Sequence, residues 1–294
     1  MRITQNILYN TYVSDMMRRQ SSIYETTLQL STGKKVNKPA DDPVNASKIL
    51  SSRSLLSTYG QYAKNIDSGL AYLSISEQTL GSVKDLISKV QETAVSESTG
   101  TADATSRANA ATLVGDLYDQ LLSLANTSYD GKHIFGGYET GASPFDQAGA
   151  YSGDTNKQSI RIGEGNYVTI GVNGGEVFKG AGGGVDIFQT VTDLVTALGA
   201  NDQAGIQASI GSLDAAFSQV SNAVADIGGK VTRLTDAQTG LSSLTVELKM
   251  MLSGLEDADL TKVMTELQLD QVALQAAMTS AGNVFSVNIF DYLK

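Results

Sequence analysis

Few residues in this chain have the types and spacing that catalysis requires. The sequence contains no Cys and a single His, His133, which lies between Lys132 and Ile134. The absence of Cys excludes disulfides, thiolate metal sites and cysteine nucleophiles. For His133 we therefore expect a structural or surface role rather than catalysis.

The adjacent carboxylates of Asp41 and Asp42 are the best candidates for holding a cation. They stand between Pro39 and Pro43 in a charged stretch that follows Gly33, and two prolines prevent a helix from continuing through it. An Asp directly before a Pro is suited to cap and begin the next helix. Neither a His nor a third carboxylate lies nearby in the sequence, so a capped structural turn is favoured over a metal site.

The glycine-rich segments in the middle of the chain do not match a phosphate-binding loop. The segment 171–174 lacks the Gly-Lys-Ser/Thr ending, and Gly180 to Gly182 lacks the required spacing and charge. We find no catalytic constellation and expect no enzyme activity, no metal and no cofactor.

Long helices dominate the rest of the pattern. From Leu234 the apolar residues recur in alternating steps of three and four, which is the spacing of a coiled-coil seam. This first run comprises Leu234, Ala237, Leu241, Leu244, Leu248, Met251 and Leu255. After a break at 254–259 a second run comprises Leu260, Val263, Leu267, Leu274, Met278, Ala281 and Phe285. Burying one such stripe does not offset the entropy of ordering the helix, so partner helices are required.

The partner helices are predicted upstream. The same spacing recurs over 44–95 and in a helix that Asp103 caps, and a weaker stripe marks a helix over 3–30 that Gly33 ends. We therefore predict an elongated bundle that brings the chain ends together. Its predicted core comprises Ile66, Leu70, Leu73, Leu117, Leu121, Leu241, Leu244 and Leu248.

The middle of the chain reads as a small β domain. Residues 159–162 and 167–172 alternate like strands, and Asn173-Gly174-Gly175 predicts a hairpin turn before a further strand at 176–178. Residues 186–227 predict a helix with a break near Asn201, and Gly228-Gly229-Lys230 predicts a turn before the C-terminal helix.

Charge and hydropathy exclude two classes of partner. The net charge of −10 argues against nucleic acid, and no apolar run approaches the roughly 20 residues of a membrane span. Residues 1–20 lack the apolar core of a signal peptide, which indicates a cytosolic protein unless another export route is used. Residues 1–38 carry a net charge of +4 and residues 231–294 carry −4. These charges either favour pairing of the two ends or are merely solvated.

Motifs at both ends of the chain resemble the bacterial flagellin family. The N-terminal signature runs from Leu30-Ser31-Thr32-Gly33 through Pro39-Ala40-Asp41-Asp42-Pro43. Residues 122–127, 134–140 and 144–145, together with 255–260, 274–277 and 290–292, are similar to the branch that joins hook to filament. The resemblance covers about 1–145 and 211–294, and Gly228-Gly229-Lys230 departs from that branch by lacking a bulkier residue.

The resemblance, together with the helical pattern, implies a mainly α fold with a small β insert, in which paired N- and C-terminal helices form a coiled-coil-like bundle. The expected organisation is an N-terminal helical region over 1–139, a variable Gly-rich β domain over 140–186, linking helices over 187–210 and a C-terminal helical region over 211–294.

The resemblance also implies a structural function outside the cell. Such subunits are exported unfolded through the flagellar type III channel, with a cytosolic chaperone on the C-terminal helix. They assemble into a ring beside a neighbouring hook-associated protein and flagellin. The apolar residues crowded into 282–294 would invite aggregation if they stayed exposed, so we expect them to pair with the N-terminal stripe. The predicted assembly interface comprises Ile3, Ile7, Leu8, Leu274, Met278, Phe285, Ile289, Phe290 and Leu293.

Two other functions remain open at this point. A filament flagellin has the same helical ends, although the stretch 135–145 speaks against it. A secreted binding module would use the β domain to hold a ligand, but residues 140–185 show no converging set of polar residues.

Overall fold

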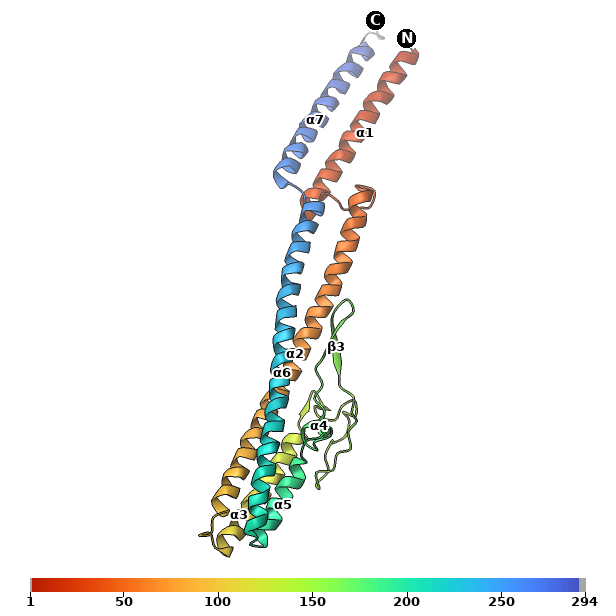
Figure 1. Cartoon of the computed structure of the whole chain (residues 1–294). Coiled ribbons are helices and arrows are strands. Elements are labelled where there is room, and N and C mark those ends of the chain that lie inside the picture. Colours follow the sequence, from red (N-terminus) through yellow and green to blue (C-terminus); the bar gives the residue numbers. More distant parts are fainter. Residues whose placement is uncertain (1, 291–294) are drawn as a thin grey trace. The chain divides into compact units, whose positions relative to one another are not determined.

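The computed structural model describes residues 2–290, with side chains described for Ile7 and for residues 9–283. The chain is mainly helical (Figure 1). Its elements are α1 (Arg2–Thr32), α2 (Pro43–Glu97), α3 (Ala104–Ala125), β1 (Ser128–Tyr129), β2 (Lys132–His133), β3 (Ser159–Gly163), β4 (Asn166–Thr169), α4 (Gly174–Val177), α5 (Ile187–Gly199), α6 (Gln203–Glu256) and α7 (Leu260–Phe290). The prediction of a mainly α fold with a small β insert is confirmed.

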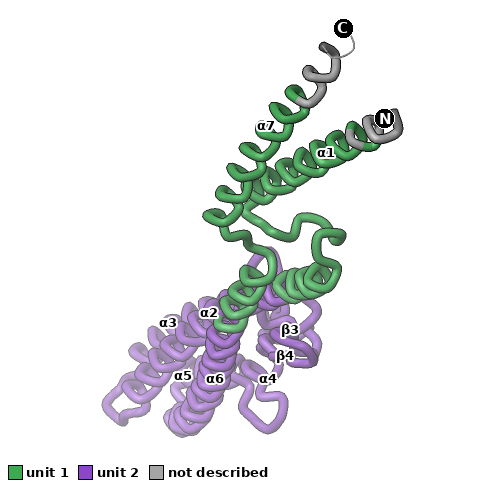
Figure 2. Tube along the Cα trace, turned by 90° about the horizontal axis from the view of Figure 1, so that it is seen from above, with its two compact units in different colours: residues 1–58, 243–294 green, residues 59–242 purple. Residues whose placement is uncertain are grey.

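The chain divides into two compact units, which Figure 2 colours separately. Unit 1 comprises residues 1–58 and 243–294, and unit 2 comprises residues 59–242. The long helices α2 and α6 contribute one part to each unit. No helix among the described residues has the length and apolar character needed to cross a membrane.

Heptad spacing builds the core of unit 2. On α6 the buried residues recur every seven positions, and the series continues into unit 1: Ile206, Leu213, Val220, Ile227, Leu234, Leu241 and Leu248. On α2 the same interval is kept by Ile66, Leu73, Leu80, Ile87 and Ala94. A seven-residue repeat keeps one stripe of a helix turned toward its neighbours. Helices α3 and α5 also contact each other in this unit.

The continuous repeat corrects one expectation. The predicted turn at Gly228-Gly229-Lys230 is wrong, because α6 runs without interruption from Gln203 to Glu256. Glycine in a helix interior costs only about 1 kcal/mol relative to Ala. The apolar stripe is in phase on both sides of the two glycines, so packing overrides their weak helix propensity.

The region between α3 and α5 contains two small antiparallel sheets, β1–β2 and β3–β4. The expected strands near 159–162 and 167–172 pair with each other, with Ile160 opposite Val168. Four phenylalanines form the centre of the region: the ring of Phe145 lies 5.2 Å from each of the rings of Phe178 and Phe188, and Phe135 lies 5.2 Å from Phe178. All four are buried.

The predicted hairpin turn at Asn173 is also wrong. The Asn173 side chain accepts a hydrogen bond from the Glu176 N–H at 3.0 Å and thereby caps α4, a single helical turn, where a third strand was expected. Asn is as suitable for a helix N-cap as for a turn, and the local sequence does not distinguish the two uses.

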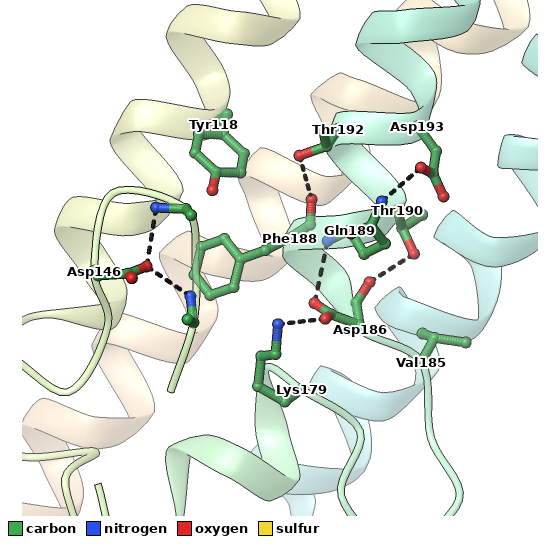
Figure 3. A network of polar contacts seen from close by, with 12 residues as sticks. Tyr118, Asp146, Lys179, Val185, Asp186, Phe188, Gln189, Thr190, Thr192 and Asp193 are labelled. Carbon is green, nitrogen blue, oxygen red and sulfur yellow. Dashed lines mark hydrogen bonds and ion pairs between the residues drawn. The ribbon is translucent and has the colours of Figure 1, made fainter. Parts of the chain in front are cut away.

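A polar network fixes the start of α5 against this region (Figure 3). Asp186 caps the helix by accepting from the Gln189 N–H at 3.1 Å, and it also pairs with Lys179. The ring of Phe188 meets that of Tyr118 edge to face at 5.6 Å. Burial raises the pKa of Tyr118, and nearby carboxylates including Asp146 and Asp186 raise it further. The network stabilises the insert.

Candidate assembly surface

The turn between α1 and α2 is built by backbone capping. Gly33 has a φ of 69° and donates its N–H to the Gln29 carbonyl at 2.8 Å, which ends α1. Asp42 accepts from the Asn45 N–H at 3.0 Å at the start of α2. Asp41 accepts from the N–H groups of Asn37 and Lys38.

These hydrogen bonds explain the electrostatics of the turn. Hydrogen bonds from the backbone of Lys38 and Asn37 lower the pKa of Asp41, and the hydrogen bond from the Asn45 backbone lowers that of Asp42. Among the side chains that the structure describes, no three His, Cys, Asp or Glu residues converge as metal ligands. The two carboxylates are therefore occupied by backbone groups.

The break between α6 and α7 lies directly against this turn. The Lys35 N–H donates to the Glu256 carbonyl at 2.7 Å, and the Ala258 N–H donates to the Gly33 carbonyl at 2.9 Å. The Lys35 ammonium donates to the Gly254 carbonyl at 2.8 Å. We call residues 33–35 and 254–258 the junction.

Glu256 is the buried charge of the junction. Its side chain is 9% exposed and pairs with Lys34 at 2.8 Å and with Arg53 of α2. Burial acts to raise the pKa of Glu256, but hydrogen bonds and charge from Lys34 and Arg53 outweigh burial and hold the pKa below its ordinary value. The carboxylate is therefore charged at neutral pH and has both cations as partners.

Helices α1 and α7 contact each other beyond the junction. Ser22 of α1 donates to the Asp270 carboxylate of α7 at 2.6 Å, and Arg19 lies 3.9 Å from the same carboxylate. Within the described parts of the two helices, the buried side chains are Thr26, Val263 and Ala281. This packing surface is narrow for two helices of 31 residues each.

The predicted assembly residues divide into two groups. Ile7 is 60% exposed and Met278 is 51% exposed, while Leu274 is partly buried. The remaining residues, Ile3, Leu8, Phe285, Ile289, Phe290 and Leu293, lie outside the described side chains.

The predicted bundle residues are buried or partly buried with one exception. Ile66, Leu73, Leu117, Leu121, Leu241 and Leu248 are buried, and Leu70 packs against the core. The assignment of Leu244 to the core is wrong, because its side chain is 49% exposed.

Helix geometry explains the error at Leu244. Residues three and four positions beyond a core residue lie on opposite sides of it. The residues four positions beyond Leu241 and Leu248, which are Thr245 and Leu252, are partly buried. The residues three positions beyond, Leu244 and Met251, are exposed. Both sides carry apolar residues, and their spacing alone does not select one.

Exposed apolar side chains concentrate in unit 1. Of the 21 large apolar side chains that are exposed in the described residues, 16 belong to unit 1, although it contains the smaller share of the chain. They are Ile7, Tyr9, Met17, Tyr24, Val44, Leu50, Leu55, Leu244, Val246, Met250, Met251, Leu260, Met264, Leu269, Val272 and Met278. Concentrated apolar exposure marks protein–protein interaction sites.

Net charge is concentrated in unit 2, whereas the exposed apolar side chains are concentrated in unit 1. Unit 2 has ten Lys and Arg against twenty Asp and Glu, so it carries the whole net charge of −10. Unit 1 has eleven of each sign and is neutral. Neutral surfaces associate more readily than surfaces that share a strong charge. The candidate assembly surface therefore lies on unit 1.

Sequence reasoning missed the polar residues of this surface. Glu256, Lys34 and Arg53 are far apart in the chain, and nothing in their spacing indicates that they meet. One signal in the sequence pointed to Glu256. It is a charged residue at the break that follows a long apolar stripe, and a charged residue that is buried there needs a partner.

Two family models match the chain. The model of the bacterial flagellin N-terminal helical region matches residues 3–140, and that of the bacterial flagellin C-terminal helical region matches residues 210–293. Together they cover both sets of long helices and omit most of the β insert.

Known proteins are similar over nearly the full length. The chain is 28% identical to flagellar hook-associated protein 3 of Salmonella typhimurium, over 99% of both chains. It is 26% identical to the protein of the same name from Escherichia coli, over 100% of both. A solved structure of a putative flagellar hook-associated protein from Vibrio parahaemolyticus has a TM-score of 0.69 and 20% identity. That match covers 74% of this chain and 100% of the solved one, and it supports the fold.

Proposed function

Because the chain belongs to the bacterial flagellin family, we propose that it is a structural subunit of the flagellum that joins the hook to the filament. The observation that carries this proposal is the end-to-end similarity to two proteins named flagellar hook-associated protein 3. The role is structural and requires no catalytic group or cofactor.

The distribution of apolar surface and charge supports assembly through unit 1. Its exposed apolar residues would be buried against copies of the same chain in a ring, and against a neighbouring hook-associated protein and flagellin. A head-to-tail interface that repeats around an axis closes into a ring. The acidic unit 2 would keep free subunits from associating before assembly.

The proposal also covers how the subunit is exported and which protein binds it before export. The subunit leaves the cell through the flagellar type III channel and becomes part of the extracellular flagellum. A cytosolic chaperone covers α7 before export, because exposed residues such as Leu269, Val272 and Met278 would otherwise promote aggregation.

Immunogold labelling of flagellated cells tests the proposal. An antibody against unit 2 should label one position at the distal end of the hook. A deletion strain should show no label, and the plasmid-borne gene should restore it. Label along the whole filament would favour the alternative, a filament flagellin, and label on neither structure would contradict both.

A further inference from the structure

The two helix breaks of the junction satisfy each other's backbone groups. A helix leaves its last carbonyls without intrahelical partners. At the end of α6, the carbonyls of Gly254 and Glu256 accept from the side chain and backbone of Lys35. In return, the Ala258 N–H donates to the Gly33 carbonyl. Each break therefore provides the partners that the other lacks.

The Glu256 side chain adds charge to this backbone pairing. A carboxylate that is 9% exposed is costly to bury unless it is paired, and here both Lys34 and Arg53 reach it. The cations also stand at the C-terminal end of α6, where the helix dipole favours positive charge. Lys34 belongs to one break and Glu256 to the other, so this ion pair stabilises the contact between the two breaks.

The junction and the helix pair share one register. In an antiparallel helix pair, both chains rise equally per residue, so residue numbers at the same level have a constant sum. The pairs 35–256, 34–257 and 33–258 each sum to 291. Eleven residues further along α1, the pair Ser22–Asp270 sums to 292. The register at the junction is therefore retained along α1 and α7.

The apolar surface between α1 and α7 is too sparse to set this register by itself. Its described residues bury few large side chains, and many of the apolar residues on both helices are exposed. In coiled coils with ambiguous apolar seams, a polar residue at a defined position specifies the register. Glu256 is such a group at the level where the two helices meet.

We propose that Glu256 is a positioning residue for assembly, which sets the register of α1 against α7 by holding the two breaks of the junction together. The inference rests on the proposed function, because the register determines which apolar positions of the chain ends are level. The same sum places position 7 level with position 284 and position 3 level with position 288.

Cysteine cross-linking can measure the register, since the chain has no native Cys. The pair S22C and D270C reports the observed register, because these two side chains are 2.6 Å apart. The pair S22C and L274C reports a shift of one turn. Each pair would be placed in the parent chain and in E256Q, E256D and E266Q. Glu266 is exposed on α7 and is the matched control for loss of one carboxylate charge in the same unit.

Mild oxidation of subunits bound to purified hooks, and of subunits that associate with one another at high concentration, then gives the ratio of in-register to shifted disulfide. We expect E256Q to lower this ratio about tenfold, the factor set by one charge-assisted hydrogen bond, or to abolish hook binding. E256D should retain both the ratio and binding, and E266Q should match the parent chain. Thermal unfolding of unit 2 should be unchanged in all variants, which excludes general misfolding as the cause.

Two results would overturn the proposal: a ratio in E256Q equal to that in E266Q, or a lowered ratio with normal hook binding and filament growth. If the parent chain fails to bind hooks, the proposed function fails instead. The ratio in subunits that associate with one another at high concentration then still decides whether Glu256 sets the register.

Discussion

At the residue scale, burial distinguishes two leucines that have the same role in the sequence pattern. Leu241 is 8% exposed, and Leu244, one turn further along α6, is 49% exposed. We expect Leu241→Ala to lower the free energy of unfolding by about 2–5 kcal/mol, since it leaves a cavity in the core. Leu244→Ala should change it by less than about 0.5 kcal/mol. Denaturant unfolding of both variants measures the difference, and equal losses would place Leu244 in the core after all.

The Glu256 carboxylate makes the junction sensitive to acid. Although burial acts to raise its pKa, hydrogen bonds from Lys34 and Arg53 lower it below the ordinary 4.5. For a carboxylate with a depressed pKa, the stabilisation is fully present above the ordinary pKa and is lost as pH falls through the folded pKa. In subunits assembled on hooks, we expect exchange protection of the Lys35 and Ala258 amides to fall with pH below about 4.5.

The comparison variant for the acid response is E256Q, which retains Asp257 in the junction and Asp41 and Asp42 in the turn between α1 and α2. Subtracting its pH profile from that of the parent chain isolates the contribution of Glu256. If the two profiles fall in parallel, another carboxylate controls the junction.

At the element scale, the long helices and the β3–β4 pair were predictable, and the shortest elements were not. Heptad spacing along α2 and α6 repeats over many turns, so each repeat confirms the phase of the last. In contrast, α4 is a single turn that Asn173 caps, and β1 and β2 have two residues each. Such elements are held by tertiary contacts, including burial of Phe178 against Phe135 and Phe145, which no local pattern encodes.

The polar contacts of the candidate surface could not be predicted for a similar reason. Spacing indicates which residues share a helix face, but it does not indicate which two distant faces meet. The Ser22–Asp270 hydrogen bond joins residues 248 positions apart. The sequence therefore predicts where the terminal helices lie in the chain. It does not predict their register or the polar contacts that hold them together.

The same sparse packing predicts that the terminal helices are unstable in an isolated subunit. Few of the described side chains of α1 and α7 are buried, and segments with little burial open at low free-energy cost. We expect about 1–40 and 260–294 to be disordered in the free subunit and to fold on assembly. Limited proteolysis should trim both ends to a stable middle. Strong exchange protection of Ile7 or Phe285 on a verified monomer would contradict this expectation.

At the scale of the whole molecule, the two units differ in their core packing, net charge and exposed apolar surface. Unit 2 has a continuous core of its own and carries all the net charge. Unit 1 is neutral and contains most of the exposed large apolar side chains of the described residues. This division suits a subunit in which unit 2 has its own core and the terminal helices pack against neighbouring subunits.

The division predicts that export and assembly can be separated at the C-terminus. Val284, Phe285, Val287, Ile289, Phe290 and Leu293 crowd the last residues of the chain. Each anchor that a neighbour buries contributes about 1.5–3 kcal/mol, and a ring repeats the contact at every subunit. From the resemblance to flagellins we expect the export signal near the N-terminus. We therefore expect deletion of 282–294, or Ile289→Asp with Phe290→Asp, to leave the protein secreted but unable to join the hook.

Such cells should release filament subunits into the medium and be non-motile. The measurements are the amount of truncated protein in the culture supernatant and on purified hooks. A matched control replaces two exposed polar residues of α7, Gln268 and Gln275, with Asp, which adds the same charge without removing apolar anchors. The control should still decorate hooks, because charge alone does not remove the buried area. If the truncated protein decorates hooks and filaments grow, the end of α7 is not the assembly element, and unit 1 must associate through its exposed α2 and α6 residues instead.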